Sequence, residues 1–251
     1  MDSSEGSSSC AQQQEKIEIQ NSHNEKLVGL LHETGSREVV VLCHGFKSDK
    51  NNTILKNVAA ALEKEGISAF VSISLVTERV KAVSITVTTI TKLMTYTLSS
   101  NTSLPRTLSL PPLLDTVEEY GNIRNVINIS GRYDLRKGIR LGDGYLERIK
   151  EQGFIDAKEG KSEFRVTQES LMERLNTDMH DACLKIEKEV RVLTVHGSGD
   201  KVVSVGDAEE FGKIIPNHKL EILKNADHGY TKHQSLLVST VMEFIKAVLV
   251  K

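Results

Sequence analysis

The sequence has few of the features that mark secreted, membrane-spanning or nucleic-acid-binding proteins. Its three cysteines, Cys10, Cys43 and Cys183, are scattered without C-x-x-C spacing, which argues against a disulfide framework or a structural zinc site. No apolar run approaches the roughly 18 residues needed to span a bilayer. The net charge of -2 provides no global field that would attract nucleic acid or an anionic membrane. We therefore expect a cytoplasmic protein that binds small molecules, with no nucleic-acid or membrane partner; its oligomeric state is left open.

The beginning of the chain lacks the signals of a leader segment. Residues 1–14 contain no arginine and no apolar core, and they are rich in serine and glutamine, a composition typical of disordered segments. We expect a disordered tail over residues 1–14. A single domain over residues 15–251 is expected because a chain of this length can bury one substantial core.

Glycine is missing from a long central stretch. All 17 glycines lie outside residues 67–120, which hold three of the four prolines, Pro105, Pro111 and Pro112. The pattern G-x-S-x-G occurs nowhere in the chain. A serine nucleophile on a sharp strand-to-helix turn requires such glycines, because the turn is strained and its helix packs closely. The Ser/Thr-rich residues 74–119 therefore cannot build this nucleophile elbow.

The rest of the chain alternates strand and helix patterns. Period-2 or continuous apolar runs predict strands at residues 16–19, 26–31, 38–43, 67–73, 123–129, 191–195 and 218–223. Helical spacing of apolar residues predicts helices at residues 52–65, 145–152, 168–175, 178–186, 205–214 and 231–249. This order favours an α/β fold with a mostly parallel, doubly wound sheet.

Residues 131–189 differ from the remainder in having weaker apolar character. The helices expected there begin after Thr167 and Thr177, and both threonines are suitable N-caps. A helical segment inserted between two strands of the sheet is typical of a cap or lid over a site. We expect residues 131–189 to form such a cap.

Three polar segments follow strands, at the edge where open α/β sheets bind ligands. His44-Gly45-Phe46 follows the third strand, and a glycine there lets backbone N–H groups face an oxyanion. Taken alone, such a tripeptide is more often an ordinary strand-to-helix turn. Asp200 and His228 follow two late strands in order. Individually they read as a turn aspartate and a solvated loop histidine.

The order of acid and histidine before a C-terminal helix, together with the run at residues 41–46, resembles the α/β-hydrolase family. The resemblance is to its plant-type cytosolic serine hydrolases, the branch of esterases and serine aminopeptidase-like proteins. It covers residues 15–70 and 123–251, and includes the runs N-V-A-A-A-L-E-K-E-G at 57–66 and S-G-R-Y-D-L at 130–135. The fold expected is an α/β-hydrolase fold with a helical cap and a disrupted elbow region at 74–119.

The resemblance also implies roles for single residues. Asp200 is the triad acid, His228 the general base, and the N–H of Phe46 an oxyanion donor, with His44 and Gly45 shaping the turn. No metal and no organic cofactor are implied. His196 inherits no role from the family.

A frame-shifted reading of a normal hydrolase gene is our hypothesis for residues 74–119. Synonymous codons for residues 112–119, read from the third nucleotide, give I-I-G-H-S-R-G, which contains an intact elbow. Residues 71–84 give F-D-F-S-G-N-G-E-S-E-G-S-F in the same offset. Loss of a single nucleotide near Phe70 suffices. A genuine Ser/Thr-rich insertion in a divergent protein is the alternative.

The sequence therefore predicts a serine hydrolase by descent, acting on an ester, thioester or amide of a small acyl substrate, but inactive as written because the nucleophile is absent. The alternative is a non-catalytic ligand-binding or interaction protein on the same fold. A dehalogenase or epoxide-hydrolase type with an Asp nucleophile is a third possibility, although Asp115 lacks elbow flanks.

Overall fold

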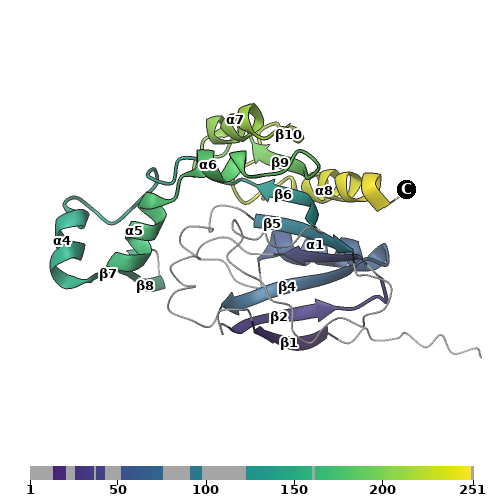
Figure 1. Cartoon of the computed structure of the whole chain (residues 1–251), viewed down its shortest axis with the longest axis horizontal. Helices are drawn as coiled ribbons and strands as arrows, with labels where there is room; N and C mark the ends of the chain where they lie inside the picture. The colour runs from purple at the N-terminus through teal and green to yellow at the C-terminus, as the bar shows by residue number, and fades with distance from the viewer. Residues whose placement is uncertain are drawn as a thin grey trace, which may run out of the picture.

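A computed structural model describes residues 14–20, 26–36, 38–42, 52–75, 91–97, 123–159 and 162–249 of the chain. Its main feature is an eight-stranded sheet in the order β1-β2-β4-β3-β5-β6-β9-β10 (Figure 1). The strands of this sheet are β1 (Gln14–Gln20), β2 (Lys26–His32), β3 (Glu38–Leu42), β4 (Ser68–Leu75), β5 (Thr91–Thr97), β6 (Ile123–Ile129), β9 (Arg191–Gly197) and β10 (His218–Leu223). Every strand expected from the sequence is present, and β5 is an additional one.

Most strands of the sheet run in the same direction. β3 pairs with β4, β6 with β9 and β9 with β10 in parallel. β1 pairs antiparallel with β2, and β2 antiparallel with β4. The strands β1, β3, β4, β6, β9 and β10 therefore point one way, and β2 and β5 the other. The parallel strands carry their carboxyl ends to one edge of the sheet, which we call the rim; β3, β6, β9 and β10 end there at Leu42, Ile129, Gly197 and Leu223.

Strand β5 occupies the centre of the sheet but is reversed. It pairs antiparallel with β3 on one side and with β6 on the other. Its first residue, Thr91, lies opposite Ile129 at the rim, and its last, Thr97, lies opposite Glu38 at the far edge. A chain that leaves β5 therefore leaves it at the edge opposite the rim.

Helices cover both faces of the sheet. The helices on one face are α1 (Thr53–Lys64) and α8 (Gln234–Leu249), which pack against each other. The buried side chains Leu55, Leu62 and Leu237 belong to them and share one core with Leu193 of β9. Helix α7 (Val205–Ile214) packs on β9 and β10. Burial of all but the first residue of β9 follows from this double cover.

The end signals of α1 were readable in the sequence. The side chain of Asn52 accepts hydrogen bonds from the N–H groups of Ile54 and Leu55, at 2.9 and 3.4 Å, so it caps the helix start. After the helix, Gly66 has a φ of +72°, a left-handed conformation that glycine adopts without strain. Burying Leu55 and Leu62 completely stabilises the fold by about 1.5–3 kcal/mol for each side chain.

Between β6 and β9 the chain forms a lobe with a small core of its own. It contains α4 (Tyr145–Gln152), the antiparallel pair β7 (Phe154–Glu159) and β8 (Ser162–Thr167), α5 (Gln168–Asn176) and α6 (Met179–Leu184). Figure 1 shows α4, β7, β8 and α5 to the side on which β4 and β6 end. The buried core of the lobe consists of Ile149, Ile155, Val166 and Leu171.

The structure corrects two details of this segment. Thr167 caps α5 as expected, accepting from the N–H of Ser170, but α6 is capped by Asp178 rather than by Thr177. The hydroxyl of Thr177 instead donates to the carbonyl of Glu173 in the preceding helix. The hairpin of β7 and β8 was also missed, because its short alternation lies between two helical patterns. Within the described ranges, no helix has the length and apolarity needed to cross a bilayer.

The reversed direction of β5 has a direct spectroscopic consequence. In antiparallel pairing, NOEs between Hα protons should join the start of β5 to the end of β6, near Thr91 and Ile129, and the end of β5 to the start of β6, near Tyr96 and Ile123. The parallel pair β6 and β9 is the internal control, because its Hα protons give no such pattern. NOEs that place Thr91 beside Ile123 would contradict the reversed strand.

Candidate active site

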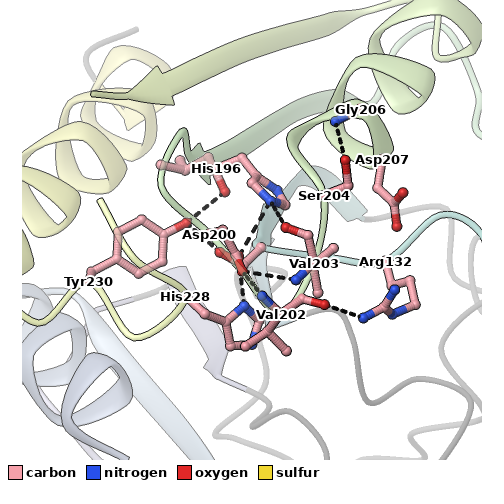
Figure 2. A network of polar contacts seen from close by, with 12 residues as sticks. Arg132, His196, Asp200, Val202, Val203, Ser204, Gly206, Asp207, His228 and Tyr230 are labelled. Atoms are coloured by element: carbon pink, nitrogen blue, oxygen red, sulfur yellow. Dashed lines mark hydrogen bonds and ion pairs between the residues drawn. The ribbon is translucent and has the colours of Figure 1, made fainter. Parts of the chain in front are cut away.

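Asp200 lies in a tight turn immediately after β9. Its backbone N–H donates to the carbonyl of Gly197 at 3.1 Å. Its Oδ1 accepts hydrogen bonds from the N–H groups of Val202 and Val203, at 2.8 and 2.9 Å (Figure 2). The side chain is completely buried, with an exposed fraction of 0%. The expectation that Asp200 is a turn aspartate is therefore correct, but its second oxygen remains for another partner.

That partner is His228, in the loop between β10 and α8. Its Nδ1 lies 2.7 Å from Oδ2 of Asp200. A carboxylate accepts and does not donate, so the hydrogen lies on Nδ1, and Nε2 is the basic nitrogen. The side chain of His228 is 41% exposed. The arrangement is thus an imidazole reachable by solvent and oriented by a buried carboxylate, the geometry that a general base requires.

The pKa of Asp200 reflects its partners. Burial by itself raises this pKa, but hydrogen bonds from His228 and from the N–H groups of Val203 and Val202 outweigh the effect of burial, and the pKa is lowered from its ordinary value. Asp200 is therefore ionised at neutral pH, which gives His228 a negatively charged partner.

Two glycines let the His228 loop approach the end of β9. A Cβ at Gly197 would lie 2.2 Å from the carbonyl oxygen of Ala226, and a Cβ at Gly199 would lie 3.2 Å from the same atom. The N–H of Gly199 donates to this oxygen at 3.0 Å. The N–H of Asn225 donates to the hydroxyl of Ser198 at 2.8 Å. Residues 197–199 thus hold the loop that positions His228.

Tyr230 anchors the other side of that loop. Its hydroxyl donates to the carbonyl of Val195 at 3.0 Å and lies 2.6 Å from the hydroxyl of Ser130, which must therefore be the donor to it. Both Tyr230 and Ser130 are buried and have positive φ values, of 52° and 53°. Burial raises the pKa of the Tyr230 hydroxyl, which stays protonated and can donate. Strained non-glycine residues of this kind persist where the surrounding structure holds them, typically near functional sites.

The turn after Asp200 is held by two further side chains. Arg132 donates from its guanidinium to the carbonyl of Val202 at 2.6 Å. The Nε2 of His196 lies 3.1 Å from the carbonyl of Val203. Figure 2 shows both side chains converging on the turn from opposite sides. The sequence reasoning did not identify Arg132, Tyr230 or His196, since their roles depend on contacts between distant segments.

The other residues expected at the site are not described. His44, Gly45 and Phe46 lie outside the described residues, as do Pro105, Pro111, Pro112, Asp115 and most of residues 74–119. The described part of that stretch includes β5, whose carboxyl end lies at the edge of the sheet away from Asp200 and His228. Among the residues with described positions, no three of His, Cys, Asp and Glu converge to hold a metal ion.

Solved structures with the same fold are numerous, whereas neither a protein-family model nor a curated protein sequence matches the chain. Est1E from Butyrivibrio proteoclasticus superposes with a TM-score of 0.69 at 17% sequence identity, covering 94% of this chain and 99% of that one. For alpha/beta hydrolase domain-containing protein 10 from mouse the TM-score is 0.65, at 14% identity and 93% and 99% coverage. The esterase Pf2001 of Pyrococcus furiosus has a TM-score of 0.60, at 17% identity and 94% and 90% coverage. The chain has the α/β-hydrolase fold.

Within this fold, the close approach at Gly197 should be essential. We expect Gly197→Ala to destabilise the protein by about 1–3 kcal/mol, because its Cβ would displace the Ala226 carbonyl and with it the His228 loop. Chemical denaturation measures this change. Gly206→Ala is the control, since a Cβ there meets only the Ser204 hydroxyl at 3.5 Å. Equal stability of the two variants would contradict the packing described.

The lowered pKa of Asp200 gives stability a defined pH dependence. A carboxyl group whose folded pKa lies below its ordinary value of 3.8 stabilises the fold above that pH, and the contribution is lost as the pH falls through the folded pKa. We expect Asp200→Asn to be less stable than the parent at pH 7 and the difference to shrink below about pH 4. Asp143→Asn, at an exposed loop position, is the control. A difference for Asp200→Asn that stays constant between pH 7 and pH 3 would contradict the assignment.

Proposed function

We propose that this protein descends from serine hydrolases that cleave an ester, thioester or amide of a small acyl substrate, and that it retains the acid and base of their triad. Asp200 is the acid and His228 the general base. The observation that carries the proposal is the 2.7 Å contact between His228 Nδ1 and the buried Oδ2 of Asp200. In a complete triad, Nε2 of His228 takes the proton of the serine hydroxyl, and ionised Asp200 stabilises the imidazolium that forms.

The nucleophile is the missing member. No G-x-S-x-G serine exists in the sequence, and the strand between β3 and β6 runs away from the rim. An elbow places its serine just beyond the carboxyl end of a strand, so β5 cannot present one to His228. We therefore propose that the chain as written forms no acyl-enzyme.

A frame shift that begins near Phe70 and continues through residues 74–119 accounts for this loss most simply, with the rest of the gene being that of a plant-type serine hydrolase. The intact product would carry the serine of G-H-S-R-G and the N–H of Phe46 as an oxyanion donor. Its three scattered cysteines suit a reducing cytoplasm. Residues 131–189 form the cap over the acyl site in this proposal. Ferulic acid bound to Est1E is an example of a small ligand on the same fold.

A non-catalytic binding protein is the second candidate, and the reversed β5 favours it. In that case the Ser/Thr-rich segment is genuine and the sheet has been rebuilt around it, with both free edges of β3 and β6 paired. The cap then covers a ligand site without chemistry. This candidate explains the lost nucleophile without a fault in the gene.

Labelling with a fluorophosphonate separates the two candidates, because the probe reacts with a serine that a neighbouring histidine activates. We expect no labelling of the chain as written, measured by intact-protein mass spectrometry against a heat-denatured control. A version with the frame restored should label at the G-H-S-R-G serine. In that version, Asp200→Asn and His228→Ala should each lower kcat for a p-nitrophenyl ester by about a thousandfold or more.

Two results would contradict the proposal. Stoichiometric labelling of the chain as written would show a working nucleophile. Near-normal turnover of His228→Ala in the frame-restored protein would show that His228 is not the general base. A transcript that encodes residues 66–125 as printed, together with binding of a small ligand and no labelling, would favour the binding protein.

A further inference from the structure

We infer that His196 is a positioning residue for the acid of the site: its Nε2–H holds Asp200 and the turn after it in the orientation that His228 requires. This inference rests on the proposed roles of Asp200 and His228. It adds to them a second, fully buried imidazole beside the carboxylate.

The ring of His196 lies next to the carboxylate of Asp200 and next to the backbone of the turn that follows it. It lies near the end of β9, four residues before Asp200, with a side chain that is 0% exposed. Its Nε2 is 3.1 Å from the carbonyl oxygen of Val203 and 3.4 Å from Oδ2 of Asp200. The same Oδ2 accepts from His228. Oδ2 therefore lies between two imidazoles, while Oδ1 is taken by two backbone N–H groups.

The partners of His196 determine its tautomer. The carbonyl of Val203 only accepts hydrogen bonds, so Nε2 must carry the hydrogen and donate it to that carbonyl. Oδ2 of Asp200, which also only accepts, lies 3.4 Å from the same nitrogen. The Nδ1 atom is buried and has no hydrogen-bond partner within the described part of the chain. With its hydrogen on Nδ1 instead, the ring would bury an unpaired donor and leave the Val203 carbonyl without this partner, which is costly.

The turn explains why a donor is needed at this place. Val202 and Val203 donate their N–H groups to Asp200, and the carbonyl of Val202 is held by Arg132. The carbonyl of Val203 is a further polar group of the turn, and the Nε2–H of His196 donates to it. The Nε2–H of His196 thus holds the backbone at Val203, next to the N–H groups that donate to Oδ1 of Asp200. The same nitrogen lies 3.4 Å from Oδ2. His196 therefore helps to keep both oxygens of Asp200 in their orientation.

A neighbouring residue supplies a matched control. Thr194 lies two residues earlier on β9, on the same face and also fully buried. Its hydroxyl interacts with His218 at 2.8 Å and accepts from Asn128 at 3.4 Å, and neither of these contacts involves Asp200. A substitution at Thr194 therefore removes a buried hydrogen bond on this face without touching Asp200, whereas a substitution at His196 removes one beside Asp200.

The test follows the Nδ1 proton of His228 by NMR of histidine-labelled protein, using the chain as written. The low-field signal of this proton reports the hydrogen bond to Asp200 directly. In His196→Gln the amide nitrogen takes the place of Nε2, and in His196→Asn it takes the place of Nδ1. We expect His196→Gln to keep the signal, and His196→Asn to shift it upfield and speed its exchange with water by up to about tenfold. Thr194→Val should keep the parent signal.

Each outcome decides between the claims. Equal signals in His196→Asn and His196→Gln, an effect of Thr194→Val as large as that of His196→Asn, or a lost signal in His196→Gln, whether through unfolding or not, would overturn the role of His196. Asp200→Asn is expected to abolish the low-field signal. A low-field signal that survives in Asp200→Asn would instead show that His228 is not hydrogen-bonded to Asp200, which would contradict the proposed function.

Discussion

The buried carboxylate of Asp200 is the group on which the rest of the described site depends. A charge removed from water is tolerated only when hydrogen bonds and opposite or polar partners surround it. Asp200 has such partners from three segments: the turn that follows it, the histidine of the next loop, and the strand that precedes it. Each segment is therefore held where the carboxylate requires it, and the exposed imidazole of His228 is oriented as a consequence.

The sheet supports this arrangement even though its central strand is unusual. The edges of β3 and β6 face each other across one strand width, and unpaired buried backbone groups there would be costly. A Thr-rich segment forms a strand readily, and residues 91–97 fill the space in the antiparallel direction. The fold needs a strand at this position, whereas the chemistry needs that strand to end at the rim. The two requirements are separable, so the loss of the nucleophile that we propose leaves the pair of Asp200 and His228 intact.

The sequence predicted those elements whose signals are local. The runs at Ile123–Ile129 and His218–Leu223, and the helix Val205–Ile214, were expected with the bounds that the structure has. The fold was predicted from the order of these elements and from the family resemblance. Asp200 and His228 were singled out by their order after two late strands, and the resemblance implied their roles. The last helix begins at Gln234 rather than at residue 231, because the N–H of Thr231 donates to the side chain of Asp227 in a turn that precedes the helix.

Features that depend on contacts between distant segments were beyond the sequence. The direction of β5 in the sheet cannot be predicted from its own residues, because a period-2 pattern of side chains is the same for a parallel and an antiparallel strand. His196 appears in the sequence only as one polar residue in a buried strand, and Tyr230 as an aromatic residue in a loop. Their hydrogen bonds, to Val203 and to Val195 and Ser130, join segments that only the folded chain brings together.

A double-mutant cycle between Asp200 and His228 tests the central claim most directly, namely that the chain holds a formed acid–base pair. The free energy of unfolding would be measured at pH 7 for the parent, for Asp200→Asn, for His228→Ala and for the double variant. The account predicts a coupling energy of about 1–3 kcal/mol, the size found for contacting polar pairs. Additivity within about 0.5 kcal/mol, as found for residues that do not interact, would contradict it.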